Sequence, residues 1–156
     1  MSIKFVVDEM NGDIARWLRI IGFDTLYLKG ENLDEQLLKI AIDEDRILLT
    51  SDKVLYQKAV RMNIKAVYTG GKDLREKLTK IATSLNLHSY VREIREYRCP
   101  ICNTVLTEVD HFKRHSISIK LPDCTPLYMC PSCKKLYWKG SHWKNITNFL
   151  KEIGLI

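Results

Sequence analysis

The first 90 residues alternate between short apolar runs and longer stretches in which apolar residues recur every three or four positions. The short runs are rich in β-branched residues, as buried strands are, and the longer stretches have the periodicity of helices with one buried face. The pattern predicts strands over 3–7, 25–28, 46–50 and 64–68, and helices over 11–21, 33–42, 52–62 and 74–85. Strands that alternate with helices predict right-handed βαβ units, and therefore an α/β domain whose parallel sheet is covered on both sides.

Several residues are suited to the ends of these helices. Gly22 follows the first helix and is a natural C-cap. Asn32, with Glu35 three residues later, has the spacing of a capping box for the second helix. Ser51 or Asp52 is expected to cap the third helix.

The pattern changes near His88. Residues 89–97 alternate charged and apolar side chains, which predicts a connecting strand. Residues 98–140 hold all five cysteines and all four prolines, and are expected to form short strands and turns. Residues 142–153 have one apolar helical face that can pack back on the α/β domain. We therefore predict two domains, over 1–90 and 91–156.

Four of the five cysteines form two matching Cys-Pro-x-Cys units, made by Cys99, Cys102, Cys130 and Cys133. Each unit supplies two thiolates from one turn, and zinc prefers four such ligands in a tetrahedron. A lysine after the second unit would offset part of the negative charge. Four buried free thiols would not explain why the Cys-Pro-x-Cys motif occurs twice, and no thioredoxin-like sequence context supports a redox pair. Because four protein ligands leave no open position, the zinc is expected to be structural.

The other candidate metal ligands of this segment are secondary. Cys124 is expected to be a small core residue. His111 and His115 have an i, i+4 spacing that can bind metal, but four cysteines already complete the shell.

Composition and charge narrow the function classes. The 156 residues are 46% hydrophobic and 28% charged, which is ordinary for a globular protein, and no uncharged apolar run approaches the length of a membrane span. The N-terminus reaches Asp8 too soon for a signal peptide, so a cytoplasmic location with reduced cysteines is expected. The net charge of +6 is concentrated in residues 91–156, with 11 Lys/Arg against 6 Asp/Glu, whereas residues 1–90 have 14 against 13. A basic surface favours nucleic acid as a partner, although it can also serve solubility alone.

Acidic residues fall at the expected carboxyl edge of the sheet. Asp8 directly follows the first strand, Asp52 follows the third, and Asp34 begins the second helix near the same edge. Ligands of open parallel sheets bind at this edge, and three converging carboxylates would require a hard cation such as Mg²⁺ or Mn²⁺. Each acid also has an ordinary explanation, as a helix cap, a charge on a helix dipole or a turn residue. Asp73, after the fourth strand, is the first further candidate, ahead of Glu9, Asp13 and Glu35.

Several stretches resemble a known family. Residues 5–10 (Phe-Val-Val-Asp-Glu-Met), 15–25 (Ala-Arg-Trp-Leu-Arg-Ile-Ile-Gly-Phe-Asp-Thr) and 46–52 (Arg-Ile-Leu-Leu-Thr-Ser-Asp) resemble the Mut-seven C-terminal RNase domain family. The second Cys-Pro-x-Cys unit and residues 137–143 (Tyr-Trp-Lys-Gly-Ser-His-Trp) are similar to its zinc ribbon. The resemblance covers nearly the whole chain. It implies a three-layer PIN-like nuclease fold with a zinc ribbon, and metal-dependent RNA cleavage in which Asp8, Asp34 and Asp52 match the acidic positions.

Basic residues near these stretches are candidates for binding substrate. On the first helix, Arg16 or Arg19 can reach a bound phosphate, and the alternative is a solvated helix face, which we favour more for Arg19. In the second domain, Lys139 and His142 are candidate RNA contacts. Trp143 can stack on a base, but packing of the terminal helix against the ribbon is the preferred interpretation.

We therefore predict a ribonuclease in which Asp8 and Asp52 coordinate Mg²⁺ or Mn²⁺, and Asp34 completes the shell or orients the attacking water. The rival hypotheses are a non-catalytic RNA-binding protein with the same fold, and a module that binds a protein partner or forms an oligomer. A phosphoacceptor role for Asp52 is disfavoured because no suitably placed lysine follows the fourth strand.

Overall fold

The computed structural model describes residues 3–92, 94, 96–114, 116–118, 120–122 and 125–156, with only the backbone of His111 and Phe112. The N-terminal part is built on a parallel sheet in the order β2-β1-β3-β4. Its strands are β1 (Lys4–Val7), β2 (Asp24–Tyr27), β3 (Ile47–Thr50) and β4 (Ala66–Tyr68). A 3₁₀ turn, η1 (Glu9–Asn11), precedes the helices α1 (Gly12–Ile21), α2 (Leu33–Asp43), α3 (Lys53–Arg61) and α4 (Leu74–Leu85). The predicted α/β fold and its parallel sheet are confirmed.

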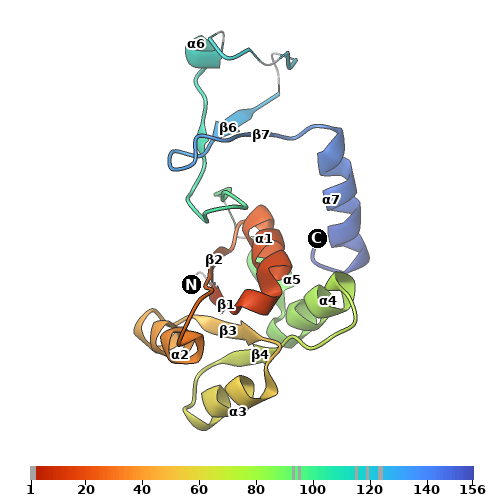
Figure 1. The fold of residues 1–156 in the computed structure, drawn as a ribbon. Coiled ribbons are helices and arrows are strands. Elements are labelled where there is room, and N and C mark those ends of the chain that lie inside the picture. The colour runs from red at the N-terminus through yellow and green to blue at the C-terminus, as the bar shows by residue number, and fades with distance from the viewer. Residues whose placement is uncertain (1–2, 93, 95, 115, 119, 123–124) are drawn as a thin grey trace.

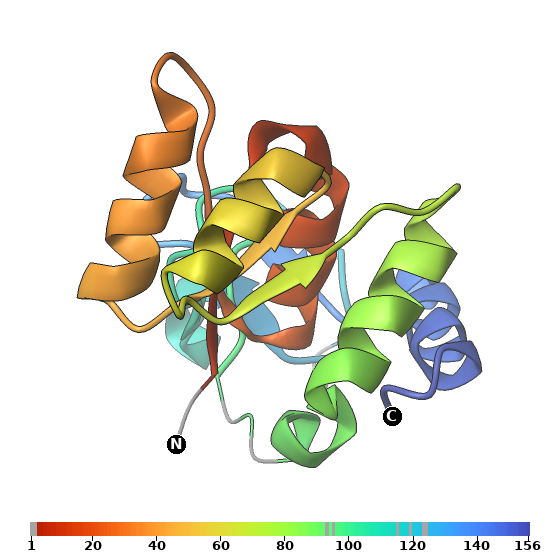
Figure 2. The ribbon, with the colours of Figure 1, turned by 90° about the horizontal axis from the view of Figure 1, so that it is seen from below.

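Helices cover both faces of this sheet (Figures 1 and 2). Alternate residues of a strand point to opposite faces, so Phe5 and Val7 belong to one core cluster and Val6 to the other. The first cluster includes buried residues of α1 and α4, and the second includes those of α2 and α3. The predicted three-layer arrangement follows from this division.

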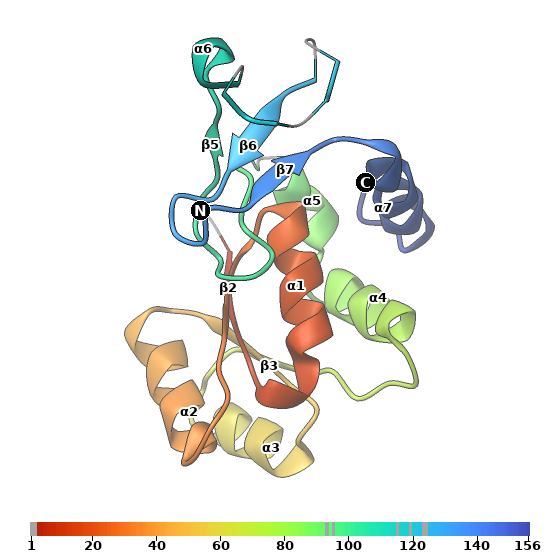
Figure 3. The same cartoon turned by 45° about the horizontal axis from the view of Figure 1, so that its top comes forward.

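The C-terminal part contains a small antiparallel sheet and a long helix. The sheet has the order β5-β6-β7, from β5 (Thr107–Glu108), β6 (Leu127–Met129) and β7 (Leu136–Trp138). A short helix, α6 (His111–Arg114), follows β5, and α7 (Ser141–Glu152) follows β7. We call the segment from Arg98 to Lys139 the ribbon. Figure 3 shows it at the end of α1 that points away from β3 and β4.

The terminal helix packs back on the α/β domain, as its apolar face predicts. Leu150, Ile153 and Leu155 are buried in the same cluster as the inner faces of α1 and α4. The rings of Trp17 and Phe149 lie 4.5 Å apart between their centroids, and Arg75 of α4 forms an ion pair with Glu152. The boundary between residues 90 and 91 stays a prediction, and the helix assigned to the second domain shares the core of the first.

The connecting strand predicted over 89–97 is wrong in its first part, because Leu87–Val91 form a helix, α5. Asn86 adopts a left-handed conformation (φ 49°) that turns the chain from α4 directly into α5. Leu87 is then fully buried, and Tyr90 and Val91 pack against the same core. Residues 93 and 95 lie outside the described residues.

The helix ends confirm two of the three predicted caps. Gly22 is left-handed (φ 118°), and its N–H donates to the carbonyls of Leu18 and Arg19. Asp52 caps α3. The capping box at Asn32 is wrong, because Asn32 is left-handed (φ 50°) and its side chain makes no cap hydrogen bond. Within the described ranges, no helix combines the length and the apolar character needed to cross a membrane.

Candidate functional site

Four cysteine sulfurs meet at one end of the ribbon. The Sγ atoms of Cys99, Cys102, Cys130 and Cys133 all lie within 4.8 Å of one another, and the shorter Sγ–Sγ distances are 3.3–3.5 Å. Tetrahedral zinc with Zn–S bonds of about 2.3 Å would place the sulfurs roughly 3.8 Å apart. The four thiols therefore fit a zinc ion.

The two Cys-Pro-x-Cys turns have the same backbone geometry. The first cysteine of each turn donates its N–H to the carbonyl five residues later, from Cys99 to Thr104 and from Cys130 to Lys135. Its carbonyl accepts from the residue after the second cysteine, which is Asn103 in one turn and Lys134 in the other. Both of these residues are left-handed, with φ of 69° and 59°. The duplicated sequence thus produces a duplicated turn.

The surroundings of two of the thiols shift their pKa values in opposite directions. The Thr104 hydroxyl, 3.2 Å from the sulfur, lowers the pKa of Cys102 to about 6. Hydrogen bonds with Cys130 and Cys99 raise the pKa of Cys133 to about 12. Four adjacent thiols cannot all lose their protons without a compensating cation, which agrees with a metal as their partner. Cys124 and His115 lie outside the described residues, as does the His111 side chain.

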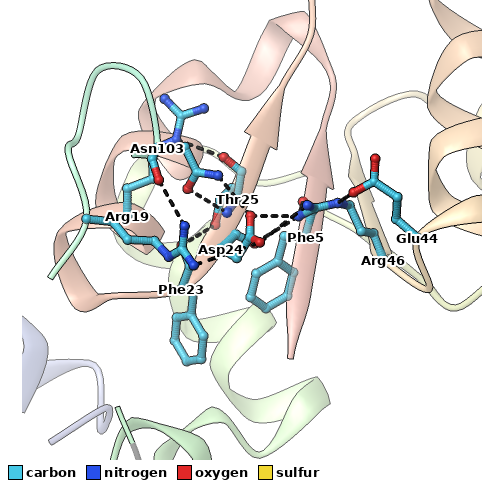
Figure 4. A network of polar contacts seen from close by, with 9 residues as sticks. Phe5, Arg19, Phe23, Asp24, Thr25, Glu44, Arg46 and Asn103 are labelled. Carbon is cyan, nitrogen blue, oxygen red and sulfur yellow. Dashed lines mark hydrogen bonds and ion pairs between the residues drawn. The ribbon is translucent and has the colours of Figure 1, made fainter. Parts of the chain in front are cut away.

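The first cysteine turn is docked on the α/β domain by a buried polar network (Figure 4). Asn103 is 8% exposed; its Oδ1 accepts from the N–H of Thr25 at 2.9 Å, and its Nδ2 donates to Asp24 Oδ1 at 2.8 Å. Asp24 also pairs with Arg46 at 2.8 Å, and Arg46 reaches Glu44 at 2.7 Å. The ribbon is therefore fixed at the start of β2, the amino edge of the parallel sheet.

Arg19 belongs to the same network. The interpretation of Arg19 as a solvated residue is wrong, because it is only 6% exposed. Its Nε donates to the Thr25 carbonyl at 2.8 Å, and its Nη1 donates to the carbonyls of Pro100 and Ile101 at 3.2 and 2.8 Å. Burial lowers its pKa, while the nearby thiols of Cys102 and Cys99 act in the opposite direction. Its donors are used to hold the cysteine turn, so it is no longer among the residues that we propose to contact substrate.

A second polar cluster lies at the opposite, carboxyl edge of the sheet and is centred on Asp8, which is 5% exposed. Asn11 Nδ2 donates to Asp8 Oδ1 at 2.6 Å, while the Ser51 N–H, at 3.1 Å, and the Thr50 hydroxyl donate to Oδ2. A carboxylate has about four lone-pair positions, so these donors leave one position on Oδ1. The side chain is held in one orientation.

The hydroxyl-bearing residues after β3 and β4 connect this cluster to its neighbours. Thr50 Oγ1 accepts from the backbone N–H of Asp52 at 3.0 Å, so one hydroxyl bonds both to the Asp8 carboxylate and to the main chain of Asp52. Ser51 Oγ donates to Asn11 Oδ1 at 3.0 Å and lies 3.1 Å from Thr69 Oγ1. Lys77 of α4 also reaches Asn11 Oδ1, at 3.4 Å. The carboxyl edge is therefore a connected polar site.

The other predicted acids are arranged differently from Asp8. Asp52 is exposed, and its Oδ1 accepts from the N–H groups of Val54 and Leu55 at 2.7 and 3.1 Å. Asp34 is exposed in the first turn of α2, and Asp73 caps α4 by accepting from Glu76 at 2.9 Å. We searched the described residues for groups of three or more metal-ligating side chains that are close enough to share one ion. The group found is that of the four cysteines. The three aspartates thus do not converge on one point here, because Asp8 is turned inward and Asp34 begins an exposed helix.

Sequence reasoning missed the polar residues around Asp8. These are its partners Asn11, Thr50 and Ser51, and the residues that contact those partners, Thr69 and Lys77. The available signal was the polar ending of the third strand, where Thr50 and Ser51 follow an apolar run. Asn11 and Lys77 carried no comparable signal, because their contacts depend on how η1 and α4 meet the sheet edge.

Three of the four predicted substrate-binding residues lie around one cavity. This cavity, of about 190 Å³, is lined by residues of α1, the ribbon and the start of α7, and these include Arg16, Lys139 and His142. A wider groove of about 470 Å³, lined by Gly12 and Asp13 at the start of α1, shares Arg16 and His142 with it. Trp143 also lines the smaller cavity and is partly buried there, between α7 and the ribbon.

The fold and these sites define an α/β protein with a polar site at the carboxyl edge of its sheet and a four-cysteine ribbon at the amino edge. Its sequence matches the family model of the Mut7-C RNAse domain over residues 3–150, nearly the whole chain. The chain therefore belongs to the Mut7-C RNAse domain family, a family of ribonuclease-like domains. Comparisons with curated proteins and with solved structures found no match.

Proposed function

We propose that this protein is a metal-dependent ribonuclease whose active site is the polar cluster around Asp8. The observation that carries this proposal is the buried Asp8 carboxylate at the carboxyl edge, oriented by three donors and linked through Thr50 to Asp52. Open parallel sheets bind ligands at this edge. Membership of a ribonuclease-like family agrees with RNA as the substrate.

The donor set at this edge suits a hard cation. Asp8 and Asp52 offer carboxylate oxygens, and oxygen ligands are those that Mg²⁺ and Mn²⁺ prefer. Such an ion would supply an activated water and neutralise charge on the scissile phosphate. Because Asp34, at the start of α2, does not converge with these two acids, its proposed role is to orient the attacking water and not to bind the ion.

The remaining residues of the edge would position these groups. Thr50 and Ser51 hold Asp8, and Asn11 ties it to Lys77. The Lys77 ammonium, at 3.4 Å from Asn11 Oδ1, brings a positive charge to a site rich in carboxylates. It would attract a phosphate of the RNA backbone.

We assign a structural role to zinc at the four cysteines. With all four positions taken by protein ligands, the ion would have no open position for substrate. It would instead stabilise the two turns, one of which carries Asn103 and the carbonyls bound by Arg19. The basic ribbon would then hold the RNA, through Lys139 together with His142 at the start of α7.

The test is cleavage of end-labelled RNA by the full chain with Mg²⁺ or Mn²⁺. Wild-type protein is compared with Asp8→Asn and Asp52→Asn, and with Asp43→Asn as a matched control at the exposed far end of α2. We expect products that require the added metal and that decrease at least about 100-fold in both edge variants, the order of loss when a catalytic group is removed. The control variant should cleave like the wild type.

Folding must be checked separately, because Asp8→Asn places an amide opposite donors. Zinc content, expected at one ion per chain, and the thermal unfolding midpoint are measured for every variant. Equal products from all four proteins would indicate a contaminating nuclease. If varied RNAs are bound but not cleaved, the ribonuclease hypothesis is overturned in favour of a non-catalytic RNA-binding protein.

A further inference from the structure

The cavity between the ribbon and the α/β domain has an unusual lining. Five of its 13 lining residues are aromatic, and they come from the chain before the first cysteine and from β6, β7 and α7: Tyr97, Tyr128, Tyr137, Trp138 and Trp143. Four more are basic or imidazole side chains, Arg16, Arg98, Lys139 and His142. Asp and Glu are not among these described lining residues. The cavity therefore combines flat π-surfaces with positive charge.

Contacts among the lining residues fix the aromatic rings. The rings of Tyr97 and Tyr128 meet edge to face, with 5.1 Å between their centroids. Lys139 Nζ donates to the Tyr97 hydroxyl at 2.8 Å and lies 4.8 Å from the centroid of that ring and 5.1 Å from the centroid of the Trp143 ring. The lysine is held by a hydroxyl and by π-faces, which leave its positive charge unneutralised.

Trp138 gives the cavity an accessible aromatic face. It is 41% exposed on the edge strand β7, whereas Tyr128 on the central strand β6 is partly buried. A Cβ placed on Gly140 would lie 3.0 Å from Trp138 Nε1, so a residue without a side chain lets the indole lie close to the backbone.

We propose that this cavity binds one unpaired nucleobase of a single-stranded RNA, with its phosphate near Arg16 and Lys139. Aromatic stacking with adjacent cations is how single-stranded nucleic acid is bound without dependence on sequence. The volume of about 190 Å³ is below the roughly 300–1,000 Å³ of sites for drug-sized ligands, which suits one ring system. Arg98 has a counter-charge in Asp24, but an apolar peptide side chain would bring none to Arg16 and Lys139, so the charge favours a nucleotide.

The position of the cavity relative to Asp8 supports a continuous path for the strand. Asp8 precedes the start of α1, and Arg16 and Ile20 line the cavity from the later turns of the same helix. The wider groove reaches from Gly12 to Ile20, and α1, with 10 residues, is about 15 Å long. This inference rests on RNA as the substrate of the proposed ribonuclease, and places an anchored base a few nucleotides from the cleaved bond.

The test measures RNA binding in the absence of added divalent metal. A labelled single strand of about ten nucleotides, within the range of known single-strand sites, is compared with an abasic strand of equal phosphate count. Fluorescence anisotropy gives the Kd of each for the full-length wild type, Trp138→Leu and Tyr128→Leu. Tyr56→Leu on α3 is the matched control, since Tyr56 is also partly buried and packs on Tyr68 away from the cavity.

We expect the wild type to bind the intact strand about 5- to 150-fold more tightly than the abasic strand. Both cavity variants should lose that preference while keeping their affinity for the abasic strand, and Tyr56→Leu should retain it. Equal binding of the two strands by the wild type would overturn the proposal. So would variants that lose affinity for both strands equally with unchanged zinc content and unfolding midpoint.

The outcomes separate this proposal from the ribonuclease itself. Base-dependent binding without metal-dependent cleavage would overturn the ribonuclease and leave the nucleobase site in place. Cleavage that needs Asp8 and Asp52, with no base dependence of binding, would overturn the nucleobase site alone.

Discussion

Asp24 links three parts of the chain that are distant in sequence. Its carboxylate pairs with Arg46 beside β3, accepts from Asn103 of the ribbon, and lies 3.9 Å from Arg98. Burial alone would raise the pKa of Asp24, but the hydrogen bonds from Arg46 and Asn103 and the nearby positive charges lower it below its ordinary value. Removing this carboxylate would leave Arg46, only 6% exposed, without its main partner.

We expect Asp24→Asn to lower the free energy of unfolding by about 1.5–3 kcal/mol, the usual range for hydrogen bonds to charged groups. Because the native pKa is depressed, this contribution is present above the unfolded pKa of about 3.9 and is lost as the pH falls through the native pKa. Urea unfolding should therefore show a constant difference in the free energy of unfolding between wild type and variant from neutral pH down to about pH 4. Below that pH the difference should narrow. Asp45→Asn is the control, because its pair with Lys65 spans 3.9 Å between exposed groups. An equal loss in both variants would contradict this account.

The sequence predicted residues whose role follows from local position, and missed those whose role depends on contacts. Gly22 and the four cysteines could be assigned from spacing alone, and the cap of α3 could be narrowed to Ser51 or Asp52. Asp8 could be placed at the sheet edge, but its hydrogen bonds with Asn11 and Thr50 could not. Arg19 was misjudged because its position on α1 gives no sign that the ribbon would cover it.

At the scale of elements, the two cysteine turns have the same backbone conformation but differ in the contacts that their side chains make. Asn103 and Lys134 occupy equivalent left-handed positions. Asn103 bonds to β2 through both of its side-chain polar groups, whereas Lys134 is exposed. Only the first turn thus joins the ribbon to the parallel sheet.

This difference gives a matched pair of variants, Asn103→Gly and Lys134→Gly. Glycine adopts the left-handed conformation without strain, so neither change should disturb its turn. Asn103→Gly removes a partner of the buried Thr25 N–H, and we expect it to reduce the free energy of unfolding by about 1–3 kcal/mol. It should also speed hydrogen exchange at Thr25. Lys134→Gly should leave both quantities nearly unchanged, and equal zinc content in both proteins would show that the turns are intact. A large effect of Lys134→Gly would contradict the assignment.

Strands and helices of the α/β domain could be predicted because their apolar periodicity reflects burial in the two core clusters, one on each face of the parallel sheet. The segment after α4 could not, since the alternation of charged and apolar residues over 89–97 suits a strand as well as a short helix. What decides between them is the left-handed Asn86, which turns the chain so that Leu87 reaches the core.

At the scale of the whole molecule, the ribbon and the Asp8 cluster occupy opposite ends of α1. Figure 3 shows the ribbon at one end of α1. The ribbon is docked at the amino edge of the sheet through Asp24 and Thr25, and Asp8 follows β1 at the carboxyl edge. The excess positive charge of residues 91–156 was evident from the sequence. Its distance from the acidic edge was not, because that distance depends on how the ribbon docks. On the proposed function, the most direct route for an RNA between the two ends runs along α1.

Arg16 lies between the two ends and tests this path. It is exposed and lines both the cavity and the wider groove. If Arg16 contacts one phosphate, Arg16→Gln should weaken binding of single-stranded RNA and reduce the slope of log K against log salt by about 0.7. Arg61→Gln removes the same charge from the exposed end of α3, on the other face of the sheet, and should leave the slope unchanged. The measurement is anisotropy over roughly 50–200 mM salt without divalent metal, a range over which several phosphate contacts produce a large loss of affinity. Equal slopes for wild type and Arg16→Gln would mean that Arg16 contacts no phosphate, and would place the strand elsewhere on the protein.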